Sequence, residues 1–199
     1  MVTLRAPVST SALWLAPRLP KFREIHPDIE LRSVSNIWTD VAGSDDVDVE
    51  LRVGRGDWTD AASEKLSDET IVPICGVNAD TTDTTIERIL AGPLIYVLGQ
   101  EADWGRYFAA HNLSVPTQVS EYYVDTMSAA IELAATGGGY AVVMSRLVET
   151  ANSTSKRVAV AGKGVPIPDG YYLMRPTTKR SKRAEVQLFE DWLIEQFAD

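Results

Sequence analysis

The chain has 199 residues, of which 45% are hydrophobic and 24% are charged, and its formal net charge is −9. This length allows one large domain or two small lobes, each with a core of its own. The acidic balance repels a polyanion such as DNA at long range, which argues against nucleic-acid binding by these residues themselves.

A single cysteine and two histidines limit the chemistry available to the chain. Cys75 has no second cysteine to pair with, which excludes an internal disulfide and is typical of the reducing cytoplasm. The histidines lie too far from it in the sequence to predict a zinc site. No run of about 18 apolar residues predicts a membrane span, and the first ten residues lack the apolar core of a signal peptide. We therefore expect a cytoplasmic protein without membrane contact.

The first helix is predicted directly after a short strand at 2–7. One of the hydroxyl residues Ser9, Thr10 and Ser11 suits the helix N-terminus. Apolar residues then recur at helical spacing from position 15 to 22. Two prolines in this stretch each remove a backbone donor, so we expect the first turns to be kinked or irregular.

The remaining elements follow from hydrophobic periodicity and from glycine and proline stops. Strands are expected at 29–34, 47–53, 69–77, 94–98, 140–144 and 170–176. Helices are expected at 84–90, 103–113, 125–135 and 183–198. Strands that alternate with helices indicate an α/β protein. The chain enters a middle αβ region near 71–77 and leaves it near 171–175, an arrangement typical of a two-lobed, hinged binding protein.

The glycine clusters do not form a cofactor motif. Gly54 and Gly56 follow a predicted strand, as a dinucleotide-binding loop would. However, Thr59 stands where a third glycine is required, and no helix opens there. The cluster at 136–139 precedes a strand and so marks the end of a helix. No cofactor is predicted.

The sequence offers no recognisable catalytic group. His26 lies at a helix end before Pro27, and His111 lies in a polar turn. Cys75 lies in an apolar strand, where an inert buried thiol is the favoured interpretation. No serine-hydrolase elbow or metalloprotease motif is present. These features predict a protein that is not an enzyme.

Two predicted helix starts favour ligand binding instead. The first offers Ser9, Thr10 and Ser11, and the second offers Thr126 after Asp125, which suits the cap position. Free N–H groups and hydroxyls at such positions can hold a carboxylate or carbonyl. Taken singly, each cluster is more often a routine N-cap, so both interpretations stay open at this point.

Several segments, taken in order, resemble the effector-binding domain of LysR-type transcriptional regulators. They are "WLAPRLPKFREIHPDIELRS", "DDVDVELRVGRGDW", "ETIVPICG", "GYYLMRP" and "FEDWL". The similarity covers essentially the whole chain and is weakest at 78–122 and 147–168. The branch that it resembles holds the glycine-cleavage activator and the β-lactamase-inducing regulator.

The resemblance implies a periplasmic-binding-protein type II fold, in which two αβ lobes are joined by two crossover strands and enclose a small effector. Lobe I would comprise 1–74 plus 175–199, and lobe II would comprise 75–174. Family members act as homodimers or tetramers and carry an N-terminal winged helix-turn-helix that contacts DNA. This chain shows no such segment, so we expect an excised effector domain that reaches DNA only through that missing part.

By position, the resemblance also implies a pocket made of hydroxyl, amide and acidic side chains. Its hydroxyls and backbone N–H groups would hold a carboxylate, and its acidic groups would take an amine or amide. The expected effector is therefore an amino acid, a peptide or a small carboxylate-like compound. The implied pocket residues are Ser9, Thr10, Ser35, Asn36, Asp40, Asp125, Thr126 and Tyr172.

By this resemblance, the strand at 47–53 would be central in lobe I and would deliver Gly54, Arg55 and Gly56 toward the cleft side, with Trp58 packing at the rim. Glu50 stands where the family usually has a small apolar residue. A carboxylate inside a sheet needs a partner, and Arg52 lies on the same face two residues later. Alternatively, Glu50 reaches a cavity and binds a cationic group. We favour the structural pair.

Two further classes of protein compete with this interpretation. A stand-alone type II solute-binding protein for an amino acid or similar small molecule would share the fold, and it predicts a secretory leader or a lipid anchor in the gene. A deaminase-like lyase on the same scaffold would need an activated acid–base pair, which the sequence does not offer.

Overall fold

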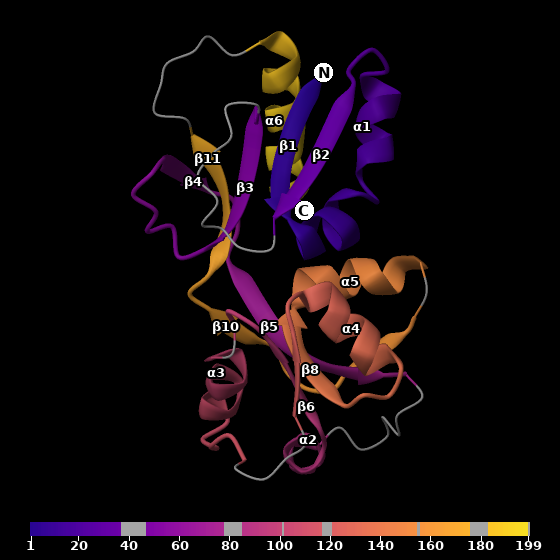
Figure 1. The fold of residues 1–199 in the computed structure, drawn as a ribbon, viewed down its shortest axis with the longest axis vertical. Helices are drawn as coiled ribbons and strands as arrows, with labels where there is room; N and C mark the ends of the chain where they lie inside the picture. Colours follow the sequence, from indigo (N-terminus) through magenta and orange to yellow (C-terminus); the bar gives the residue numbers. More distant parts are fainter. Residues whose placement is uncertain are drawn as a thin grey trace. The chain divides into compact units, whose positions relative to one another are not determined.

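The computed structural model describes residues 1–36, 47–77, 85–100, 102–116, 121–154, 156–175 and 183–198. They form two units, each with its own sheet and helices (Figure 1). Unit 1 comprises Met1–Asp68 and Pro168–Asp199, and unit 2 comprises Glu69–Ile167. The predicted lobe boundary at 74/75 lies within β5 (Glu69–Gly76), which belongs to unit 2, and the one at 174/175 lies within β11 (Gly170–Arg175), which belongs to unit 1. The observed divisions come earlier in the chain at both places, at 68/69 and 167/168.

Unit 1 contains a five-stranded sheet in the order β2-β1-β3-β11-β4. β1 runs parallel to β2 and β3, whereas β11 runs antiparallel to β3 and β4. β3 therefore lies in the centre of the sheet, as predicted for 47–53. The strands are β1 (Val2–Pro7), β2 (Leu31–Asn36), β3 (Val49–Gly54), β4 (Ala62–Lys65) and β11 (Gly170–Arg175). The helices are η1 (Thr10–Leu15), α1 (Leu19–Ile25) and α6 (Ala184–Ala198).

The first helix is irregular, as its prolines predicted. η1 is a π-helical turn closed by a hydrogen bond of 2.9 Å from the Ala16 N–H to the Ser11 carbonyl. Pro17 follows it, and α1 then begins with Pro20 in its first turn. Because proline lacks an N–H, it cannot continue the hydrogen-bond ladder, so the apolar stretch divides into two short helical pieces.

Aromatic side chains fill the core of unit 1 between the sheet and its helices. Trp14 of η1 packs against Phe197 of α6, with ring centroids 4.3 Å apart, and against Tyr171 of β11. Phe22 of α1 meets Phe189 of α6 edge to face at 5.1 Å. α6 lies against β1, which is buried along almost its full length. The C-terminal helix thus holds the first strand and both N-terminal helices in place.

Unit 2 contains a six-stranded sheet in the order β10-β5-β8-β6-β7, with β9 also paired to β5. β6, β7 and β8 are parallel, and β5 runs antiparallel to β8, β9 and β10. The strands are β5 (Glu69–Gly76), β6 (Leu94–Val97), β7 (Glu121–Val124), β8 (Tyr140–Met144), β9 (Val158–Val160) and β10 (Val165–Ile167). The helices are α2 (Ile86–Ala91), α3 (Ala102–Ala110), α4 (Met127–Ala135) and α5 (Ser145–Thr154).

The glycine cluster at 136–139 ends α4, as predicted. The N–H of Gly138 donates to the Leu133 carbonyl at 2.9 Å, and Gly137 adopts φ +90. This left-handed conformation costs glycine little, and it lets the chain reverse into β8. No helix within the described parts of the chain is long and apolar enough to cross a membrane.

Candidate functional site

Four of the predicted pocket residues of unit 1, Ser9, Thr10, Ser35 and Asn36, lie at the C-terminal ends of β1 and β2 or directly after them. β1 and β2 run parallel with Pro7 opposite Asn36, so the two strands end side by side. Ser9 and Thr10 follow β1 at the start of η1, and Ser35 is the penultimate residue of β2. Crevices beyond the carboxyl ends of parallel strands are common ligand sites in α/β sheets. The structure therefore brings these four residues to a single edge.

Thr10 is fixed by a tyrosine of β11, the strand on the far side of β3 from β1. Its side chain is buried, and its hydroxyl lies 2.9 Å from the hydroxyl of Tyr171, which is fully buried on β11. Either hydroxyl can donate in this pair. The contact joins the start of η1 to the strand that carries Tyr172.

The Gly54-Arg55-Gly56 loop packs closely against the rings of Trp58 and Tyr172. The hydroxyl of Tyr172 donates to the Arg55 carbonyl at 3.2 Å, and the Tyr172 ring meets Trp58 edge to face at 5.3 Å. A Cβ atom on Gly54 would lie 2.9 Å from the Trp58 ring, and one on Gly56 would lie 2.6 Å from the Tyr172 ring. The glycines thus let the backbone approach these rings closely, and Trp58 packs beside the loop. The place of Trp58 at the rim of a cleft stays a prediction.

We expect Gly56→Ala to lower the free energy of unfolding by about 2–3 kcal/mol, because Gly56 has φ +80 and no room beside Tyr172. Gly137→Ala is the matched control, since Gly137 has φ +90 but nothing within 4 Å of an added Cβ. Urea unfolding of both variants separates the steric clash from the backbone strain. Equal losses in the two variants would show that the contact with Tyr172 contributes nothing.

The favoured interpretation of Glu50 as a structural pair is confirmed. Its Oε1 accepts a hydrogen bond of 2.9 Å from Nε of Arg52, whose side chain is 3% exposed. The same oxygen lies 3.9 Å from the guanidinium of Arg5. Two cations on neighbouring strands therefore compensate this carboxylate within the sheet, and it has no need of a cationic ligand.

Arg52 has a second carboxylate partner that the sequence did not reveal. Its two terminal nitrogens donate to the two carboxylate oxygens of Asp60 at 2.9 and 2.8 Å. The hydrogen bonds that Arg52 donates to Asp60 are the main cause that raises the pKa of Arg52 above its ordinary value, and the same hydrogen bonds lower the pKa of Asp60. This bidentate ion pair connects the loop after Trp58 to the central strand β3.

The predicted residues of unit 2 lie at the start of α4. The hydroxyl of Thr126 accepts a hydrogen bond of 3.2 Å from the Ala129 N–H, and its backbone is extended at φ −141 and ψ 148. Thr126 is therefore the N-cap, and the assignment of this role to Asp125 was wrong. A cap needs an extended backbone directly before the first helical residue, and that residue is Met127. Asp125 is exposed one position earlier.

Asp40 lies outside the described residues, and the side chain of Asn36 is likewise not described.

Cys75 is buried in β5, and burial raises the pKa of its thiol, as expected of an inert core cysteine. Among the residues that the structure describes, no group of three or more His, Cys, Asp or Glu side chains is placed to hold a metal ion.

Comparison with known proteins identifies the family. The sequence model described as "LysR substrate binding domain" matches residues 1–198. The chain belongs to this family. The prediction from the sequence motifs is thereby confirmed, and the type II periplasmic-binding-protein-like architecture agrees with it.

Relatives of this LysR domain include two kinds of regulator. It is 28% identical over 197 residues to the HTH-type transcriptional activator AmpR of Rhodobacter capsulatus, covering 94% of this chain and 63% of that protein. It is 22% identical over 188 residues to the glycine cleavage system transcriptional activator of Escherichia coli K12, covering 93% of this chain and 61% of that protein. The LysR domain thus spans somewhat less than two thirds of these relatives.

Solved structures show the same fold. The effector domain of AmpR from Pseudomonas aeruginosa superimposes with a TM-score of 0.84 at 23% identity, covering 99% of this chain and 95% of that one. The AmpR effector-binding domain from Citrobacter freundii gives a TM-score of 0.85 at 20% identity, covering 99% of this chain and 98% of that one. The LysR domain therefore has the architecture of these effector domains.

Proposed function

We propose that this chain is the ligand-sensing part of a LysR-type transcriptional regulator and that it acts by binding, not by catalysis. The observation that carries the proposal is the family match across residues 1–198, together with an architecture shared with effector domains. In the whole protein, DNA contact would come from a part outside this chain, which is acidic with a net charge of −9. The protein would work in the cytoplasm, where its DNA target lies.

The effector would be held by polar groups from both units. Unit 1 would contribute the sheet-edge residues Ser9, Thr10, Ser35 and Asn36, with Tyr172 beside them. Unit 2 would contribute the start of α4, where helix N–H groups and the helix dipole favour a carboxylate. Asp40 and Asp125 would bind an amine or amide. An amino acid, a peptide or a small carboxylate-like compound satisfies this combination.

Binding would regulate because the effector prefers one arrangement of the two units over another. A ligand shifts such an equilibrium only by its difference in affinity for the two states. Two copies related by a two-fold axis would pass this shift to the DNA-binding parts of a homodimer, or of a tetramer built from dimers.

A thermal-shift screen of the isolated chain against amino acids, dipeptides and aromatic acids tests the proposal. For a hit, we expect Thr126→Val to weaken affinity by about tenfold or more, because it removes a hydroxyl that orders the helix start. Thr126→Ser keeps the hydroxyl and should bind nearly as well as the unsubstituted chain.

Thr136→Val is the matched control, since Thr136 is exposed at the opposite end of the same helix. Its affinity should be unchanged. If Thr126→Val binds the hit as tightly as the control does, the start of α4 does not belong to the effector site.

A further inference from the structure

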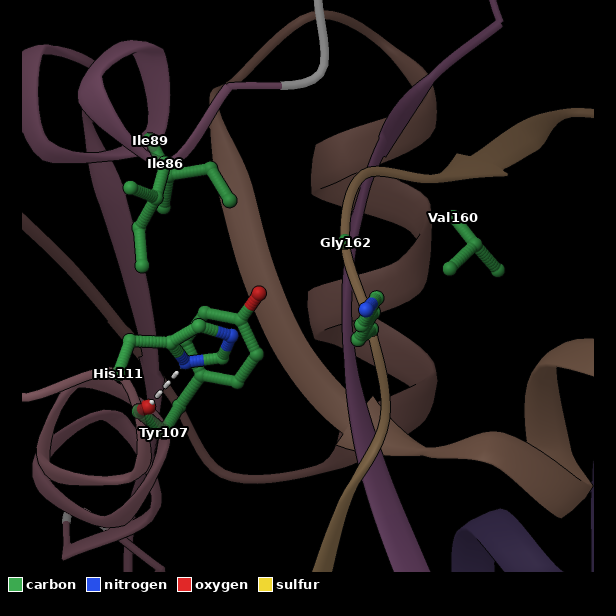
Figure 2. A pocket seen from close by; sticks show the side chains of 7 residues that line it. Ile86, Ile89, Tyr107, His111, Val160 and Gly162 are labelled. Carbon is green, nitrogen blue, oxygen red and sulfur yellow. Dashed lines mark hydrogen bonds between the residues drawn. The ribbon is translucent and has the colours of Figure 1, made fainter.

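A second concave site lies within unit 2, and its lining includes neither Asp125 nor Thr126. This cavity has a volume of about 560 Å³, within the range of roughly 300–1,000 Å³ that is usual for small-molecule sites. Its apolar walls come from Ile86 and Ile89 of α2 and from Val160 at the end of β9. Figure 2 shows these side chains on opposite sides of the cavity.

Tyr107 of α3 supplies a buried polar group to this cavity. The residue is 1% exposed, and its hydroxyl makes no hydrogen bond to another described residue. The hydroxyl oxygen is not one of the fully enclosed unpaired atoms, so it is open to the cavity that the residue lines. In Figure 2 the hydroxyl points away from α3, into the space between the two isoleucines and Gly162. Burial raises the pKa of this phenol, so it stays protonated and able to donate.

Gly162 keeps the opposite wall open. A Cβ atom there would lie 2.3 Å from the hydroxyl oxygen of Tyr107 and 3.0 Å from the Pro73 ring. Any larger residue would therefore push into the phenol and close this part of the cavity. The absence of a side chain is what allows the 161–164 loop to pass so close to Tyr107.

The cavity also carries positive charge and a second polar ring. Lys163 lines it, is exposed, and forms no ion pair within the described parts of the chain. The Nδ1 atom of His111 lies 2.9 Å from the Tyr107 carbonyl, so it donates its proton there and leaves Nε2 as the second polar atom of the ring. In a chain of net charge −9, a lysine without an ion pair among the described residues and a phenol donor that line the same cavity are suited to a small anion.

We propose that this unit 2 cavity binds a small monocarboxylate with a compact branched or aromatic body, as a second ligand distinct from the effector. The carboxylate accepts a hydrogen bond from Tyr107 and pairs with Lys163. The apolar body packs against Ile86, Ile89 and Val160. The site lies in one unit, so its occupation needs no contribution from unit 1.

Calorimetric titration of the whole chain with phenylacetate, and with the uncharged phenylacetamide, tests this proposal. We expect phenylacetate to bind and phenylacetamide to bind at least about fivefold more weakly, since it lacks the charge that Lys163 recognises. Tyr107→Phe should weaken phenylacetate binding about tenfold, because it deletes only the hydroxyl.

Matched substitutions separate the cavity from general effects. Gly162→Ala should abolish binding, whereas Gly105→Ala should not, since nothing lies within 4 Å of an added Cβ at Gly105. Lys163→Gln should weaken binding about three- to fivefold, and Lys156→Gln, at another exposed lysine of unit 2, should leave it unchanged.

Thr126→Val should bind phenylacetate as the unsubstituted chain does, so this test stands apart from that of the effector site. Three results would each overturn the proposal: no binding up to about 10 mM phenylacetate, equal affinity for phenylacetamide, or Gly162→Ala binding as tightly as Gly105→Ala.

Discussion

Replacing Arg52 with methionine is expected to lower the free energy of unfolding by about 3 kcal/mol, one of the largest effects of any single substitution in this chain. Methionine keeps much of the volume but removes the guanidinium that binds Glu50 and Asp60. The Glu50 carboxylate, only 13% exposed, then has a single distant cation, Arg5 at 3.9 Å. Asp60 is half exposed and regains contact with water. The expected loss in the free energy of unfolding is therefore near the lower end of the range of about 3–5 kcal/mol that is usual when a buried ion pair is broken.

Arg157→Met is the matched control for this prediction. Arg157 also makes a two-pronged pair, with Glu132, but both side chains are about half exposed and regain water when separated. In urea unfolding, Arg157→Met should lower the free energy of unfolding much less than Arg52→Met does. The double variant Glu50→Gln with Arg52→Met should be more stable than Arg52→Met alone, because position 50 then carries no carboxylate that has lost its main partner. Equal losses for Arg52→Met and Arg157→Met would show that burial of the Glu50 pair does not matter.

Trp14→Ala is expected to lower the free energy of unfolding by about 3–5 kcal/mol, because it leaves a cavity at the centre of the unit 1 aromatic cluster. Trp14 is fully buried between Tyr171 and Phe197. Its ring also lies 4.6 Å from the guanidinium of Arg18. Loss of this ring removes the contact that holds η1 against β11 and α6, so the start of η1 should loosen together with Thr10.

Urea unfolding followed by circular dichroism measures the loss in the free energy of unfolding. Hydrogen exchange of the Ala16 amide, which donates to the Ser11 carbonyl, reports the loosening of η1. Ile25→Ala serves as control, since Ile25 is a large apolar residue on α1 that is 63% exposed. It should change stability by no more than about 0.5 kcal/mol. A Trp14→Ala chain as stable as the control would contradict the role given to this cluster.

The elements that the sequence predicted well carry a strong local pattern. β8 is an apolar run after a glycine turn, and α4 is bounded by a threonine cap and by the glycines at 136–139. α6 repeats buried residues at helical spacing over its whole length. In these segments periodicity, caps and stops agree with one another, so local sequence is sufficient to define the element.

The elements that the sequence did not predict depend on distant partners. β4, β9 and β10 have only three or four residues each and form by pairing with β11 or β5. β7 exposes Tyr122 and Tyr123, and its place follows from parallel pairing with β6 and from stacking of Tyr123 on Tyr96. α5 is rich in Ser, Thr and Asn, which lack helix propensity. Long-range pairing overrides local propensity in the four strands, and packing against β5 and β8 does so for α5.

The residues of the candidate sites also fall into those that a local sequence pattern predicted and those that it did not. The hydroxyl residues after β1 and the start of α4 stood out because a strand or turn runs into a helix there. The link from Arg52 to Asp60 crosses a loop with no periodic pattern, and the unit 2 cavity draws on three elements far apart in sequence. Gly162 stands in no sequence pattern that predicts a cavity, and its close approach to Tyr107 is visible only in the structure.

One titration tests the central claim, that a single effector touches both units. A ligand identified by the thermal-shift screen would be titrated calorimetrically into the unsubstituted chain, into Ser35→Ala of unit 1 and into Thr126→Val of unit 2. We predict that each substitution alone weakens the affinity for the same ligand, by about threefold to tenfold or more. Affinity that falls with only one of the two substitutions would place the ligand in one unit and contradict the account.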